Sequence, residues 1–203
     1  MATNLESNEG TKTRHTGPLS GIRILDLTTV VMGPYATMIL SNLGADIIKL
    51  EPPSGDIMRH VGPMKNKFMG HSFINANHGK RSIVLDLKRP EARSVALQLA
   101  EKTDVFVHNI RPAALTRLGL DYESVASVNP RVIYASALGF GAEGRYSGKP
   151  AYDDLIQGIV GIPALVHEGG SDIPRYVPTP VADRSVGLYL SSMISAALYA
   201  REI

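Results

Sequence analysis

The sequence predicts an α/β protein with an open, mostly parallel sheet flanked by helices. Two observations support this prediction. Short apolar runs, typical of buried strands, alternate along the chain with stretches of helical character, and the first helical stretches each lie between two of the runs. A strand, a helix and a strand in this order form a βαβ unit, whose two strands are parallel and whose crossover is right-handed.

The first predicted unit covers residues 22–51. The run IRILDL, Ile22–Leu27, predicts a buried strand, and DIIKLE, Asp46–Glu51, predicts the next one. Between them, Pro34–Ala45 predicts a helix, because proline stands at its start and a glycine follows its last apolar residue.

The second predicted unit follows the same order. RSIVLDL at residues 81–87 predicts a strand, residues 90–102 a helix, and residues 104–109 a further strand. In this helix the apolar positions fall at helical spacing and proline stands in the first turn. Short helices at 112–119 and 122–128, a strand at 131–138 and a last helix over 185–203 complete the prediction.

Three long connections rich in loop-forming residues interrupt these elements, at 52–80, 139–150 and 167–183. Long irregular connections in compact domains are usually either functional or disordered. The first 17 residues are polar and predict a disordered tail, so we expect one domain over residues 18–203.

Composition excludes several classes of protein. The 21 basic and 19 acidic residues leave a net charge of +2, too weak for a nucleic-acid binder. No apolar run approaches the roughly 20 residues needed to span a bilayer, and the polar start lacks the apolar centre of a signal peptide, so we expect a cytoplasmic protein without membrane partners. The absence of cysteine rules out disulfides, thiolate metal sites and a cysteine nucleophile.

Common catalytic and cofactor motifs fail on their context. GFGAEG, residues 139–144, matches a dinucleotide-binding pattern, but the residues that follow it cannot open a helix. The six histidines show no metal-ligand spacing, and no serine lies in a G-x-S-x-G turn. We therefore expect no metal and no permanently bound cofactor. The basic residues in and beside the first long connection either face solvent or receive phosphates; they are Arg59, Lys65, Lys67, Lys80 and Arg81.

Several ordered blocks of the sequence resemble the family III CoA-transferases, which include formyl-CoA transferase, carnitine CoA-transferase and alpha-methylacyl-CoA racemase. The blocks are GIRILDLTTVVMGPYATMILSNLGADIIKLEPPSGD, NHGKRSIVLDLKRPEA, VFVHNIRPAALTRLGLDYESVASVNPRVIYASALGFGAEG, PAYDDLIQGIVG and PTPVADRSVG. They cover the chain from Leu19 onward. The resemblance implies a Rossmann-like CoA-binding and catalytic domain, the amino-terminal part of the family's large domain.

The resemblance also implies a role for Asp183, in the block VADRSVG. In the family this aspartate is the nucleophile that attacks an acyl-CoA thioester and then carries CoA as an aspartyl-CoA thioester. From the residues alone, Asp183 could equally be the N-cap of the following helix, and the two roles are compatible. A position before that helix would favour the ionised carboxylate.

The resemblance implies binding residues for coenzyme A, the co-substrate: Asn109, Ile110 and Arg117 from HNIRPAALTRLG, and Lys80 and Arg81 from NHGKRS. Two positions depart from formyl-CoA transferase, the first of them, Val31, at a substrate-binding position. Val31 stands where formyl-CoA transferase has a glutamine, which argues against formyl and oxalyl groups, and Pro52 replaces an arginine, so CoA is expected to be held differently.

Tyr152, in the motif AYDD, is expected either to line the acyl pocket or to pack half-buried. Racemases of the family have a histidine here, because moving an α-proton between faces needs a second acid or base. Tyrosine, with an ordinary pKa near 10, is a poor base, so the motif favours transferase over racemase.

Family members are about twice as long as these 203 residues, and two of their chains interlock into a homodimer. We therefore expect a truncated product or one part of a split protein. Two hypotheses remain open: a CoA-transferase acting on an acyl-CoA and a small carboxylic acid, and a non-catalytic remnant that exposes apolar surface.

Overall fold

Five parallel strands form the sheet, which confirms the predicted fold class. The computed structural model describes residues 16–203, so the expected tail at residues 1–17 lies almost wholly outside the described residues. The strands are β1 (Arg23–Leu27), β2 (Asp46–Glu51), β3 (Arg81–Val84), β4 (Val105–His108) and β5 (Ile133–Ser136). Their order is β3-β2-β1-β4-β5, so the chain changes direction across the sheet between β1 and β4.

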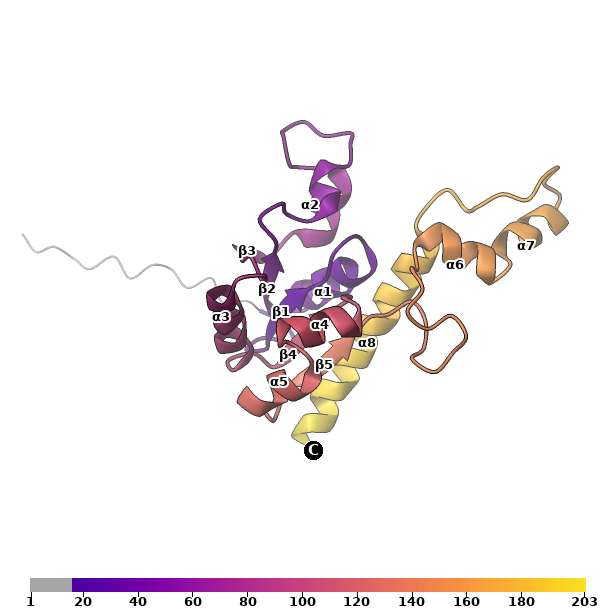
Figure 1. The fold of residues 1–203 in the computed structure, drawn as a ribbon. Helices are drawn as coiled ribbons and strands as arrows, with labels where there is room; N and C mark the ends of the chain where they lie inside the picture. Colours follow the sequence, from indigo (N-terminus) through magenta and orange to yellow (C-terminus); the bar gives the residue numbers. More distant parts are fainter. Residues whose placement is uncertain (1–15) are drawn as a thin grey trace, which may run out of the picture.

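Helices cover both faces of the sheet (Figure 1). Helix α1 (Met32–Asn42) and the carboxyl-terminal half of α8 (Val181–Glu202) pack on one face, where Ile24 of β1 lies. Helices α3 (Pro90–Ala100), α4 (Pro112–Leu118) and α5 (Tyr122–Val128) pack on the other, where Leu25 lies. Neighbouring residues of β1 thus enter different cores, as the alternation of side chains along a strand requires.

The structure adds elements that the pattern did not predict. A short 3-10 helix, η1 (Ile57–His60), and α2 (His71–Asn77) lie within the first long connection, and α6 (Asp153–Ile159) and α7 (Ile162–Glu168) precede the last helix. Figure 1 shows α6 and α7 away from the sheet, with α6 beside the start of α8 and α7 farther out. None of the helices in residues 16–203 is long and apolar enough to cross a bilayer.

The last helix begins earlier than predicted. Its first residue is Val181 rather than Ser185, and Pro180 is its N-cap residue. Asp183 therefore lies inside the first turn, and its interpretation as an N-cap is wrong. Proline is tolerated at this boundary because the first amide groups of a helix have no partner within the helix.

Candidate active site

A cavity of about 300 Å³ opens at the carboxyl ends of β1, β4 and β5. Its position, where the strand order reverses, is the usual ligand-binding position in open α/β sheets. Its lining combines residues from the connections after these strands with the starts of α6 and α8. They include Thr29, Val30, Asn109, Arg111, Leu138, Gly139, Lys149, Tyr152, Ile156, Asp183 and Val186.

Asp183 lines this cavity from the first turn of α8. Burial, followed by the negative charge of Asp153, raises the pKa of Asp183 to about 6. The helix start was expected to favour the ionised carboxylate, whereas burial and the like charge of Asp153 favour the protonated form. At pH 7 the Asp183 carboxyl group is nevertheless ionised in most molecules.

The start of α8 is bound to α6 by two polar side chains. Asp153 Oδ1 accepts the backbone N–H of Asp183 at 2.9 Å, and Asp153 Oδ2 accepts from Gln157 Nε2 at 2.6 Å. Gln157 is 2% exposed, and its Oε1 accepts the backbone N–H of Val177 at 2.9 Å. The segment between Val177 and Asp183 is thus held to α6 at both ends.

Asn109 supports the opposite wall of the cavity. Its side-chain Oδ1 accepts the backbone N–H of Thr29 at 3.1 Å, and its Nδ2 donates to the Thr29 carbonyl at 2.9 Å. The next residue, Val30, has a φ of 73°, which a β-branched residue rarely adopts. Asn109 therefore braces a strained turn that forms part of the cavity wall.

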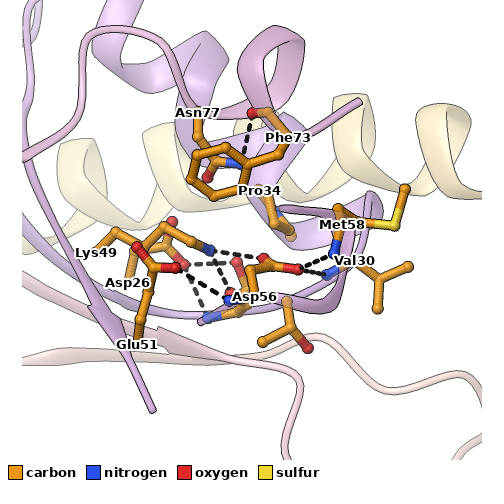
Figure 2. Close-up of polar contacts among 12 residues, drawn as sticks. Asp26, Val30, Pro34, Lys49, Glu51, Asp56, Met58, Phe73 and Asn77 are labelled. Carbon is orange, nitrogen blue, oxygen red and sulfur yellow. Dashed lines mark hydrogen bonds and ion pairs between the residues drawn. The ribbon is translucent and has the colours of Figure 1, made fainter. Parts of the chain in front are cut away.

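Buried charges contact the same turn, as Figure 2 shows for Asp56 beside Val30. Asp56 Oδ1 accepts the backbone N–H of Val30 at 3.3 Å, and Asp56 Oδ2 forms an ion pair with Lys49 Nζ at 3.0 Å. Lys49 Nζ also donates to the Thr28 carbonyl at 2.8 Å. Sequence reasoning gave no sign of this arrangement, because Lys49 and Asp56 lie on different segments that only the fold brings together.

Comparison with known proteins places the chain in a family. The family model for CoA-transferase family III matches residues 19–203. The chain belongs to CoA-transferase family III. It is 42% identical over 198 residues to the acetyl-CoA:oxalate CoA-transferase of Acetobacter aceti, covering 96% of this chain and 50% of that protein.

Further relatives agree. The succinate–glutarate CoA-transferase of Agrobacterium fabrum is 40% identical, over 89% of this chain and 47% of its own. The crystal structure of a CAIB/BAIF family protein from Brucella suis superimposes with a TM-score of 0.87 and 37% identity, covering 92% of this chain and 50% of that one. The family III chain therefore spans about half the length of the curated relatives it matches.

Three of the predicted site residues come together in this family III chain. Asp183, Tyr152 and Asn109 all line the cavity. Tyr152 is 59% exposed, so it is not the half-buried packing residue of the alternative interpretation. Val31 is the N-cap residue of α1, directly after Val30, and is absent from the cavity lining.

The other predicted binding residues lie outside the cavity lining. Ile110 packs against the core on the α3 side of the sheet, and Arg117 is exposed in the last turn of α4. Lys80 Nζ, in a side chain only 2% exposed, contacts Asp26 Oδ2 at 3.1 Å and further oxygens of Pro34 and Asn77. Arg81 pairs with Asp46 through three hydrogen bonds of 3.0, 2.8 and 2.7 Å.

Two cationic residues of the lining, Arg111 and Lys149, were not singled out from the sequence. Both are exposed, at the start of α4 and at the end of the connection before α6, respectively. Position at the ends of connections is a weak sequence signal, which could have marked them. Within residues 16–203, no group of three or more His, Asp or Glu side chains is placed to bind a metal.

Proposed function

We propose that this chain carries the nucleophile of a CoA-transferase, which moves CoA from an acyl-CoA thioester to a carboxylic acid. The observation that carries the proposal is Asp183 itself, a partly buried carboxyl group with a pKa raised to about 6 at the wall of a cavity. Membership of family III supports it. Perturbed carboxyl groups in cavities are typical of reacting groups.

The reaction needs no redox partner. An oxygen of the Asp183 carboxylate attacks the thioester carbonyl, the carbon–sulfur bond breaks, and CoA leaves as a thiolate with a mixed anhydride left on Asp183. The thiolate then attacks the Asp183 carbonyl carbon and expels the donor carboxylate, which gives aspartyl-CoA. An acceptor carboxylate enters by the same steps in reverse. Covalent catalysis of this kind divides one difficult exchange into easier ones.

The environment of Asp183 supports this role. At neutral pH the group is mostly ionised, as a nucleophile must be, yet it is more basic than an ordinary aspartate. The guanidinium of Arg111 and the ammonium of Lys149 line the same cavity. Cations at this place suit the phosphates of CoA, which pair best with Arg and Lys.

The other predicted site residues are proposed to contact CoA or the acyl group. Asn109 braces the cavity wall and is our first choice for contact with CoA, with Ile110 and Arg117 as outer contacts. Lys80 and Arg81 already form ion pairs, so any contact with CoA would be a second role. Tyr152 is proposed to face the acyl group. An interlocked homodimer and a cytoplasmic location stay predictions for the longer protein.

The substrates are proposed to be an acyl-CoA and a small carboxylic acid. The relatives are named for oxalate, and for succinate and glutarate. Val31 was expected to disfavour formyl and oxalyl groups, so a donor panel that includes oxalyl-CoA and succinyl-CoA separates these possibilities. Racemase activity receives no support, since Tyr152 replaces the second acid or base that it requires.

Intact-protein mass spectrometry tests the proposal. The chain is incubated with each acyl-CoA, with the isosteric variant Asp183→Asn as control. We expect a mass increase of CoA less one water, absent in the variant. A folded chain that gains no adduct from any donor would favour the non-catalytic alternative, for which the exposed Leu188, Tyr189 and Met193 of α8 supply the apolar surface.

A further inference from the structure

We propose that Asp153 is a positioning residue for Asp183: it holds the first turn of α8 and keeps a second negative charge beside the reacting carboxyl group. This inference rests on the proposed function, because it explains how the nucleophile is placed and activated. Asp153 is the first residue of α6, so the starts of α6 and α8 meet at the cavity.

A hydrogen bond joins the Asp153 side chain of α6 to the backbone of α8. Asp153 Oδ1 accepts the backbone N–H of Asp183 at 2.9 Å, an amide that lies in the first turn of α8 and has no partner within that helix. Pro180 supplies no side-chain cap. Asp153 therefore takes the part that an N-cap side chain usually plays, from a position 30 residues away in sequence.

Gln157 fixes the orientation of Asp153. It lies one turn later on α6, is 2% exposed, and donates from Nε2 to Asp153 Oδ2 at 2.6 Å. Its Oε1 accepts the backbone N–H of Val177 at 2.9 Å. If the amide were flipped, its oxygen would face the Asp153 carboxylate and its NH₂ group would face the Val177 N–H, so both hydrogen bonds would be lost. Both Asp153 oxygens are thereby occupied, and the carboxylate cannot rotate away from Asp183 without losing a bond.

The charge of Asp153 acts on chemistry as well as on position. Burial and this charge together raise the pKa of Asp183 to about 6. When Asp183 attacks a thioester, its negative charge passes to the departing thiolate and the acylated side chain is neutral. The repulsion between the two carboxylates therefore exists before the attack and disappears with it, which favours the acylated state.

Other titratable or charged groups face this place from the neighbouring elements. They are Tyr152 and Asp154 of α6 and its N-cap, Tyr176 before α8, and Arg111 and Lys149 across the cavity. Asp153 is the charged group whose proximity raises the pKa of Asp183. Asp153 is also the side chain that accepts a hydrogen bond from the backbone N–H of Asp183.

Two variants separate a mere helix cap from the proposed role. Asp153→Asn keeps an acceptor for the Asp183 amide but removes the charge, and it sets an amide donor against Gln157 Nε2. The double variant Asp153→Asn/Gln157→Glu restores a donor–acceptor pair there, keeps the total charge and moves that charge one helical turn along α6. Asp154→Asn, at the neighbouring exposed residue, is the matched control for loss of charge.

The measurement is the titration of the Asp183 carboxyl carbon by NMR in the whole chain, together with the pH dependence of acyl-CoA adduct formation. We expect both midpoints near 6 in the unchanged chain, and lower by about one pH unit or more in both Asp153 variants, with a several-fold slower adduct rate above pH 7. Asp154→Asn should shift the midpoint by a few tenths of a unit at most.

The outcomes distinguish the role of Asp153 from the proposed CoA-transferase function. Unchanged midpoints in a folded Asp153→Asn chain, or in the double variant if the single one does not fold, overturn the inference. Absence of any adduct in the unchanged chain overturns the proposed function instead, and the NMR midpoints then still decide whether Asp153 acts on the Asp183 carboxyl group.

Discussion

Carboxylates meet two opposite environments in this molecule. Beneath the turn after β1, Asp26 and Asp56 are fully buried and paired with the ammonium groups of Lys80 and Lys49. At the start of α8, the partly buried Asp183 faces another carboxylate, that of Asp153. The same residue type thus lies among opposite charges in the core and beside a like charge at the cavity.

The two environments move the aspartate pKa in opposite directions. Burial alone would raise the pKa of Asp26, but Lys80 and Lys49, with hydrogen bonds from two threonines, lower it to about 2. Burial and Asp153 raise the pKa of Asp183 to about 6. The core compensates for its charges, whereas the candidate site keeps a repulsion that a reaction can relieve, as is common where function is favoured over stability.

Removing a partner in the compensated region should have the largest effect. Lys80→Met leaves Asp26, which is fully buried, with only Lys49 as a nearby cation, and we expect unfolding to become easier by about 3–5 kcal/mol. Urea denaturation at pH 7 measures this. Adding Asp26→Asn to the variant removes the uncompensated charge and should recover part of the loss; a cost below about 1 kcal/mol for the single variant would contradict the comparison.

Removing the repulsive charge at the cavity should do the reverse. Asp183→Asn is expected to stabilise the chain at pH 7.5 by about 1–2 kcal/mol, less than the full pKa shift implies because solvent screens a partly exposed group. Between the unfolded pKa of 3.8 and the folded value of about 6, the folded chain binds more protons, so its stability falls as pH rises.

Urea denaturation of both chains across the pH range checks this sign. The stabilising effect of Asp183→Asn should be absent below about pH 4, grow between pH 4 and 6, and be complete above pH 7. A variant that is less stable than the unchanged chain at pH 7.5 would show that Asp183 makes stabilising contacts that outweigh its charge.

Sequence patterns predicted the sheet well and the cavity side poorly, for a physical reason. Strands at 22–27 and 46–51 were predicted within a residue, because buried parallel strands are continuous apolar runs. Helices α6 and α7 are seven residues each and bury almost no apolar side chain, so neither has an apolar stripe to detect.

Some residues of the candidate site could be predicted from the sequence and others could not. Asp183, Tyr152 and Asn109 were predicted through the resemblance to family III and not through periodicity. The roles of Asp153 and Gln157 depend on contacts with residues 20 to 30 positions away, which no local pattern contains. Their spacing of four on one helix was the only available sign, and it is a common one.

The smallest effect on stability is expected at the exposed ion pair of Arg81, the residue after Lys80. It tests whether burial sets the contribution of an ion pair. Arg81 is 61% exposed and pairs with Asp46, so Arg81→Met should cost at most about 1 kcal/mol, and less in high salt. Arg23→Met, which removes the second arginine on Asp46, is the control. A cost at Arg81 equal to that at Lys80, measured by urea denaturation, would mean that the number of charges decides stability. A small cost at one residue and a large cost at its neighbour would mean that burial does.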